Sequence, residues 1–220
     1  MTRNLRTIAL GATLFGAGLL AAAPPAFAQD AARAGEYTGP NRMLATTVPR
    51  APNFAGVPYR TTALDTRGDR RYDKVIFHAD DFGQFLVAGV RQMPEELVAQ
   101  MARDEPRRVL GVLSEATLLG WRTEFDAPPE VIRESFLETK HGEAIVRVYR
   151  ARKGSILLRA QGRRPTPEDA FDTSIASLVA RRGGLVVFVL AQNDTSPDDA
   201  NGVVRMATEL FERIRVLAER

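Results

Sequence analysis

The segment HADDFG, residues 78–83, gathers the side chains of this sequence that are most suited to chemistry. His78, Asp80 and Asp81 offer an imidazole and two carboxylates within four positions, and such groups bind metal ions or transfer protons. A metal site needs three or four convergent ligands, and no second pair of ligand residues accompanies this segment. The two aspartates also favour turns, and Gly83 accepts a positive φ that other residues avoid. We interpret the segment as a turn between two strands, and we expect no metal and no other cofactor.

Known catalytic signatures are incomplete in this sequence. Asp-Phe-Gly at the end of HADDFG matches the magnesium-binding triplet of protein kinases, but there is no glycine-rich phosphate loop and no His-Arg-Asp triplet. The two histidines, His78 and His141, have no Gly-x-Ser-x-Gly motif with which to serve in a hydrolase. QNDTSPDDANG, residues 192–202, holds a fragment of a calcium loop, but Pro197 breaks the alternation of oxygen ligands. We interpret it as a strand end followed by a capped helix.

The apolar pattern becomes dense after residue 72. Residues 74–77 and 84–90 are predicted strands on either side of HADDFG, and residues 94–104 are a predicted helix. The apolar run of residues 107–119 fits a second helix, with a strand as the alternative.

Residues 131–152 form a predicted β-hairpin with a two-residue turn at positions 141 and 142. This turn pairs Leu137 with Val146 across the two strands. The register directs Leu137, Val146 and Val148 to the core.

The opposite face of the hairpin carries four residues that could bind a partner: Glu134, Phe136, Arg147 and Tyr149. Aromatic residues and arginine are enriched at the centres of protein–protein interfaces, and a fully solvated face does not need two large rings. The alternative is that these residues form ordinary cross-strand pairs, with Arg147 balanced by acidic neighbours and the rings partly under the terminal helix.

Three elements are expected to complete the chain. Residues 166–184 carry capping residues at both ends of an apolar stripe and are predicted to form a helix. Residues 185–191, LVVFVLA, form an apolar strand that needs cover on both faces. From SPDD, residues 196–199, a last helix is expected to reach almost to Arg220. Its apolar stripe consists of Val203, Met206, Ala207, Leu210, Phe211, Ile214 and Leu217.

These elements predict an α+β fold in which a mainly antiparallel sheet is sandwiched by helices. The segments GEAIVRVYRA and GGLVVFVLAQ, with the helix from Asp198 to Ala218, resemble the PsbP/Mog-like α/β/α sandwich domains over residues 131–220. That group includes photosystem accessory proteins and a Ran-binding protein, so the resemblance implies non-catalytic binding. No binding residue of the group maps onto this sequence, and a shared fold does not by itself transfer function.

The beginning of the chain is typical of a secretory signal peptide. Arg3 and Arg6 precede an apolar run that ends near residue 23, and cleavage is expected after Ala28 in Ala-Phe-Ala. The apolar run is shorter than the roughly 20 residues of a membrane span, and the arginines are not adjacent as in a twin-arginine signal. The chain has no cysteine, which excludes disulfides and a cysteine nucleophile. We therefore expect a soluble protein that is exported to a bacterial periplasm.

The processed chain divides by composition at about residue 72. Residues 29–72 contain four prolines and isolated apolar residues, which favours a flexible or extended arm that can be deleted without unfolding the rest. Residues 73–220 are periodic and have the size of one domain. After cleavage, 28 basic and 27 acidic residues leave a net charge of +1, which does not favour nucleic acid or an anionic membrane as a partner.

These features together predict a non-catalytic accessory protein of the periplasm that binds another envelope protein or a small ligand. The alternative is a small periplasmic hydrolase or metal-dependent enzyme that uses His78, Asp80 and Asp81.

Overall fold

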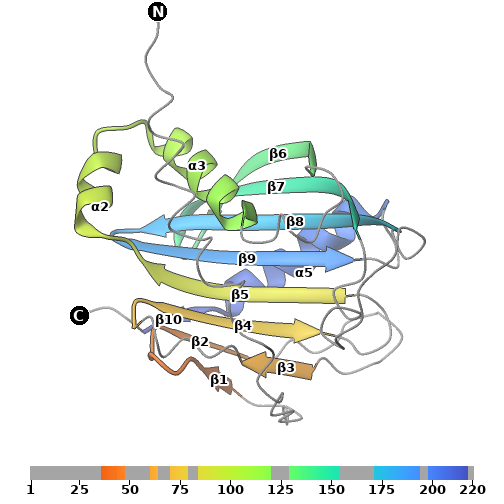
Figure 1. Ribbon diagram of the computed structural model, residues 1–220, viewed down its shortest axis with the longest axis horizontal. Coiled ribbons are helices and arrows are strands. Elements are labelled where there is room, and N and C mark those ends of the chain that lie inside the picture. The colour runs from red at the N-terminus through yellow and green to blue at the C-terminus, as the bar shows by residue number, and fades with distance from the viewer. Residues whose placement is uncertain are drawn as a thin grey trace, which may run out of the picture.

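The computed structural model describes residues 36–47, 60–63, 70–78, 84–119, 129–153, 171–193 and 198–217 (Figure 1). The first part of the chain contributes β1 (Glu36–Thr38), β2 (Leu44–Thr47), β3 (Arg60–Ala63), β4 (Tyr72–His78) and β5 (Gln84–Gln92). The helices α2 (Glu95–Met101) and α3 (Pro106–Leu119) follow. The remainder comprises β6 (Glu130–Thr139), β7 (Gly142–Lys153), β8 (Phe171–Arg182), β9 (Leu185–Asn193), α5 (Ala200–Arg213) and β10 (Arg215–Val216).

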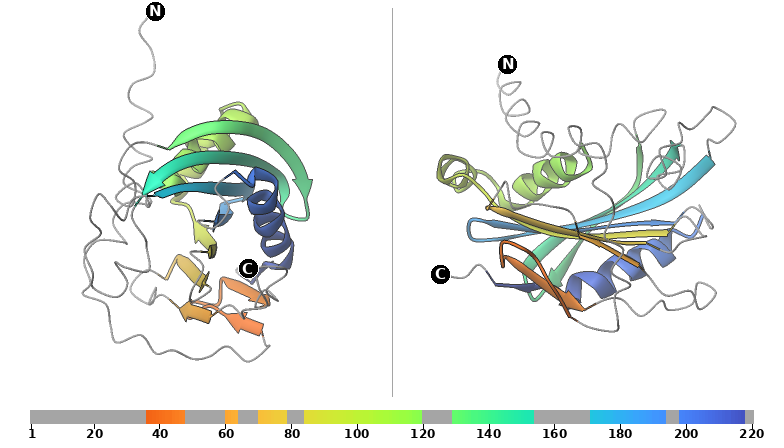
Figure 2. Two further views of the ribbon diagram at one scale, coloured as in Figure 1. Left: turned by 90° about the vertical axis from the view of Figure 1, so that its right-hand side faces the viewer. Right: turned by 60° about the horizontal axis from the view of Figure 1, so that its bottom comes forward.

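Seven of these strands form one antiparallel sheet in the order β3-β4-β5-β9-β8-β7-β6. The helices α2 and α3 lie on one face of this sheet. The helix α5 lies on the other face, beside a small sheet of order β1-β2-β10 (Figure 2). The fold is therefore the helix-sandwiched, mainly antiparallel α+β fold that the sequence predicts.

Strand alternation divides the apolar side chains of the large sheet between two cores. In β9, Val187 and Val189 face α5, whereas Val186 and Phe188 face α2 and α3. Because this central strand is covered on both sides, its sequence is apolar at nearly every position. The predicted strand at 185–191 is confirmed.

The elements around HADDFG and the two helices after it are also confirmed. The strands at 74–77 and 84–90 are parts of β4 and β5, and the helix at 94–104 corresponds to α2. For residues 107–119, the helix is correct and the alternative strand is wrong.

The helix predicted over residues 166–184 is wrong where the structure describes it, because residues 171–182 form the strand β8. Ile175 and Val179 face the α3 side, whereas Ala176 and Leu178 face α5. The positions that suggested one helical stripe are thus shared between the two faces of a strand. Helix propensity is a weak preference, and the hydrogen bonds of β8 to β7 and β9 override it. The expected cap at Thr166 lies outside the described residues.

The predicted hairpin exists, but its register is two residues away from the expected one. Leu137 pairs with Ala144 rather than Val146, and the turn consists of Lys140 and His141. The side chain of Thr139 fixes this turn, since its hydroxyl donates to the carbonyl of Gly142 at 2.7 Å and accepts from the backbone N–H of His141 at 3.1 Å. An even shift leaves each side chain on its expected face.

Leu137 is nevertheless not a core residue. It is 39% exposed, whereas Val146 and Val148 are buried as expected. The strand β6 is the edge of the sheet, and α5 packs on the strands inward of it. Leu137 therefore lies on the correct face but beyond the cover of the helix.

The expectation of a flexible arm is wrong for residues 36–47. The strands β1 and β2 lie in this segment, and Met43 and Leu44 are buried in the same core as Phe211 of α5. Isolated apolar residues are sufficient here because other parts of the chain provide the rest of the core. The boundary at residue 72 thus divides side chains that pack together.

The terminal helix begins as predicted and ends early. The Asp199 carboxylate caps it, accepting from the backbone N–H of Gly202 at 2.7 Å. The stripe from Val203 to Ile214 is buried, but α5 stops at Arg213 and β10 follows. Leu217, expected in the helix, lies after β10 and is exposed.

Candidate functional site

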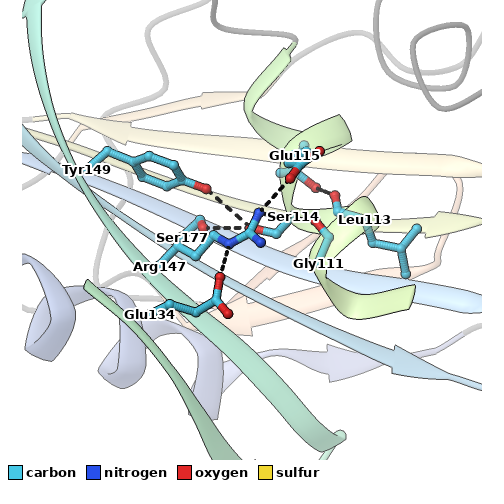
Figure 3. A network of polar contacts seen from close by, with 9 residues as sticks. Gly111, Leu113, Ser114, Glu115, Glu134, Arg147, Tyr149 and Ser177 are labelled. Carbon is cyan, nitrogen blue, oxygen red and sulfur yellow. Dashed lines mark hydrogen bonds and ion pairs between the residues drawn. The ribbon is translucent and has the colours of Figure 1, made fainter. Parts of the chain in front are cut away.

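Three of the four candidate partner-binding residues, Glu134, Arg147 and Tyr149, lie together on β6 and β7 beside α3 (Figure 3). Glu134 pairs with Arg147 in the antiparallel register, and Tyr149 lies opposite Val131. Phe136 is two residues after Glu134 on the same face of β6. The sequence thus predicted the shared face correctly, but the helix that covers it is α3 and not the terminal helix.

Arg147 joins three elements of the structure. Its Nε donates to Oε2 of Glu134 at 2.7 Å, and its Nη1 donates to the Gly111 carbonyl at 3.2 Å and lies 3.4 Å from Oε1 of Glu115 (Figure 3). Gly111 leaves room for this approach, since a Cβ at that position would lie 3.3 Å from Nη2 of Arg147. The Arg147 side chain is only 12% exposed. The guanidinium therefore fastens α3 to the hairpin, and little of it remains for a partner.

Tyr149 belongs to the core. It is 2% exposed and clusters with Leu118 and Ile175, while its hydroxyl lies 3.3 Å from the hydroxyl of Ser114. The Ser114 hydroxyl lies 3.2 Å from that of Ser177 in turn. A partner cannot reach this ring, so the expectation that Tyr149 binds one is corrected.

Phe136 is half-buried and is covered from outside by another residue. The guanidinium of Arg107 lies 4.6 Å from the centroid of its ring, and Arg107 also pairs with Glu143 at 2.6 Å. Only Glu134 of the four candidates keeps a substantially exposed side chain. The arrangement agrees with the alternative of cross-strand packing for most of this face.

Exposed apolar side chains lie instead along the edge strand β6, with Val131 on the α3 face and Leu137 on the α5 face. Val131 is 47% exposed, Ile132 is 40% exposed, and Leu137 lies farther along the same strand. In the described part of the chain, Leu217 is the one other large apolar side chain that is exposed to this extent. A bulge at Ile132 interrupts the pairing with β7 between Val131 and Arg133, which leaves a regular stretch from Arg133 to Thr139. The sequence contains a strand at this position, but it does not reveal that the strand is an edge.

A buried ammonium group lies on β4, and the sequence pattern gives no sign of its burial. Lys74 is 5% exposed, and its Nζ lies 5.7 Å from the ring centroid of Tyr72. Arg91 is the residue of β5 that pairs with Tyr72, and its guanidinium lies 5.3 Å from the centroid of the same ring. Burial, assisted by the positive charge of Arg91, lowers the pKa of Lys74 to about 8.

HADDFG begins at the end of β4. His78 is the last residue of β4, with its backbone paired to Phe85, and residues 79–83 lie outside the described residues. Within the described ranges, no three His, Asp or Glu side chains are placed to hold a metal ion together. In QNDTSPDDANG, Asp199 acts as a helix cap, as expected.

Comparisons with known proteins give a structural likeness only. The fold is similar to that of the cyanobacterial PsbP (CyanoP) of Synechocystis sp. PCC 6803. The similarity covers 90% of this chain and 98% of the PsbP chain, with 12% sequence identity and a TM-score of 0.48. The chain weakly resembles PsbP/Mog-like domains. The Saccharomyces cerevisiae Ran-binding protein Mog1p is similar over 83% of this chain and 95% of its own, at 10% identity and a TM-score of 0.40. The sequence matches no known family and no curated protein. Similarities at this level transfer no function.

No helix within the described ranges is both long enough and apolar enough to cross a membrane.

Proposed function

We propose that this chain is an exported accessory protein of the bacterial periplasm that binds an envelope protein through the outer edge of β6. We base export on the signal-peptide pattern of residues 1–28, which lie outside the described part of the structure. We base binding on one observation, the exposure of Val131, Ile132 and Leu137 along a single edge strand.

An edge strand with exposed apolar side chains is a known docking element. Its outer N–H and C=O groups can pair with an extended segment of another chain, which adds a strand to the sheet. The stretch from Arg133 to Thr139 is regular in its pairing with β7 and is long enough for such an addition. The side chains of Val131 and Ile132 at its end would supply apolar contacts.

The charges of β6 indicate the kind of segment that fits. Glu130 and Glu138 are exposed on the strand, and the exposed Glu134 accepts from Arg147, whereas the one basic residue, Arg133, donates to Asn201 and Ala200 on α5. Opposite charges across paired strands stabilise a sheet, and like charges destabilise it. The partner segment is therefore expected to be extended, apolar and basic.

Site-specific photo-cross-linking in the periplasm of the source bacterium tests this function. A photoreactive phenylalanine at position 132 should give a discrete cross-linked partner, identified by mass spectrometry. The matched control carries the same group at position 217, since Leu217 is similarly exposed but lies away from β6. Equal cross-linking from both positions, or none from position 132, would refute binding through β6.

A paired substitution supplies the second part of the test. Val131→Lys with Ile132→Lys should abolish the cross-link from a probe at position 137 and leave the urea midpoint nearly unchanged, because both side chains are exposed. Stoichiometric metal in the purified mature protein, together with hydrolytic activity that His78→Ala removes, would favour the enzyme alternative instead.

A further inference from the structure

The turn between β6 and β7 is docked against the end of α5. The ammonium of Lys140 donates to the backbone carbonyl of Glu212. The His141 ring packs edge-on against Phe211, with the ring centroids 5.2 Å apart and the planes at 89°. Two neighbouring residues of the turn thus hold the last turn of a helix that is about 70 residues later in the chain.

The His141 imidazole is enclosed and makes few polar contacts. The residue is 3% exposed, and neither Nδ1 nor Nε2 forms a hydrogen bond of regular geometry, although the backbone of Phe211 and Ile214 lies close enough to favour the charged ring. Most buried polar groups are paired, so a buried ring without a regular hydrogen bond at either nitrogen calls for a physical reason. A neutral imidazole can tolerate an apolar site beside Phe211, whereas an imidazolium there loses its hydration without gaining a carboxylate.

The charges that act on His141 also oppose its protonation. Burial lowers the pKa of His141 most strongly, and the positive charges of Lys140 in the same turn and Arg182 on β8 lower it further. The backbone of Phe211 and Ile214 at the end of α5 acts in the opposite sense but does not outweigh them. The docked turn therefore prefers the neutral ring.

We propose that this turn is a proton-sensitive latch: protonation of His141 releases the β6–β7 turn from the end of α5. The Thr139 hydroxyl, which bonds to the His141 N–H and the Gly142 carbonyl, keeps the turn itself intact when it leaves. The elements that gain freedom are the turn end of β6 and the end of α5 with Ile214, which is buried in the core. This latch does not depend on the proposed binding function.

An NMR titration of the mature protein provides the first test. The chain contains two histidines, so the resonances of His141 are assigned by their loss in His141→Gln. The expected pKa of His141 in the folded protein is below 6.5. A value at or above 6.5 would overturn the latch, because the docked state would then tolerate or prefer the charged ring.

Amide hydrogen exchange at pH 7.5 and pH 5.0 provides the second test. After correction for intrinsic rates, acidification should accelerate exchange at residues 211–216 by at least about threefold in the natural sequence, since the open state binds the proton more tightly. His141→Gln should abolish this acceleration, and His78→Gln should retain it. Equal acceleration in the natural protein and in His141→Gln would show that another group is responsible.

Lys140→Met separates the latch from general acid sensitivity. It removes the donation to Glu212 and the nearest positive charge, so exchange at residues 211–216 should become faster at both pH values while the pKa of His141 rises towards 6.5. An unchanged pKa in this variant would contradict the electrostatic part of the mechanism.

Discussion

Tyr149 of β7 lies beneath α3, with its hydroxyl 3.3 Å from that of Ser114. The ring lies on the hairpin face opposite Val146, and α3 buries it there as part of a core. Tyr149→Ala should therefore lower the free energy of unfolding by about 3–5 kcal/mol. Tyr149→Phe, which removes only the hydroxyl, should cost about 0.5–1.5 kcal/mol. Urea unfolding of both variants measures the difference. If Tyr149→Ala left the free energy of unfolding nearly unchanged, the ring of Tyr149 would have to be exposed rather than buried.

Arg147 should matter to stability more than its neighbour Arg150 does. Arg147 is mostly buried and holds Glu134 and the Gly111 carbonyl, whereas Arg150 pairs with Asp198 at 3.6 Å with both side chains largely exposed. We expect Arg147→Ala to cost about 1–3 kcal/mol and Arg150→Ala less than about 0.5 kcal/mol. Matched urea titrations compare them. Equal losses would mean that the bonds of Arg147 contribute no more than a surface pair.

Asp73 should tie the first described residues to the sheet. Its buried carboxylate accepts from the backbone N–H groups of Asn41, Met43 and Leu44 at 3.0, 2.7 and 3.3 Å. Asp73→Ala leaves these donors unpaired and should cost about 2–4 kcal/mol.

Deletion of residues 29–47 should likewise lower the urea midpoint, because it removes Met43 and Leu44 from the core. A truncated protein as stable as the full mature chain would restore the expectation of a dispensable arm.

Lys74 should make the protein more stable at alkaline than at neutral pH. Its pKa falls from 10.5 to about 8 on folding, so between these values the unfolded chain binds more protons than the folded one. Its contribution therefore rises with pH from about 8 to 10.5, and below 8 the folded state bears the full cost of a buried charge. Lys74→Met should stabilise the protein at pH 7 by about 1–3 kcal/mol and should flatten this rise. Urea unfolding at pH 7 and pH 9.5 tests both effects, and a destabilised Lys74→Met would mean that the ammonium is well solvated.

Export should leave a mature protein that begins at Gln29. Mass spectrometry of periplasmic extract measures its mass, and substitution of Ala26 and Ala28 by bulky residues should retain the precursor. A chain that starts at Met1 and stays with the membrane would contradict export by a cleaved signal.

Much of this fold follows from local pattern, and the errors share one cause. The capped start of α5 and the apolar strand β9 are readable because Asp199 and the run from Leu185 act through near neighbours. The sequence of β8 predicts a helix because Ile175, Leu178 and Val179 fit a helical stripe as well as the two faces of a strand, and only the pairing with β7 and β9 decides between them. The same limit applies to the candidate site. Strand alternation predicts that Arg147 and Tyr149 share a face, but the helix that covers this face is set by contacts between distant parts of the chain. The edge position of β6 and the burial of Lys74 depend on strand order, which no local pattern encodes.

The strand order also has a consequence for how the chain is made. The strands β5 and β9 are neighbours at the middle of the large sheet, yet Val87 and its partner Leu190 are 103 residues apart (190 minus 87). As synthesis proceeds from the first residue to the last, β5 can pair with β4 early but must wait for β9 on its other side. During that interval its apolar side chains have no partner strand on that edge, and unpaired edges of this kind favour aggregation. The pairing of β5 with β9 can occur only when nearly the whole sequence has been synthesised. Until then, the open edge of β5 is the part of the incomplete sheet that most favours aggregation.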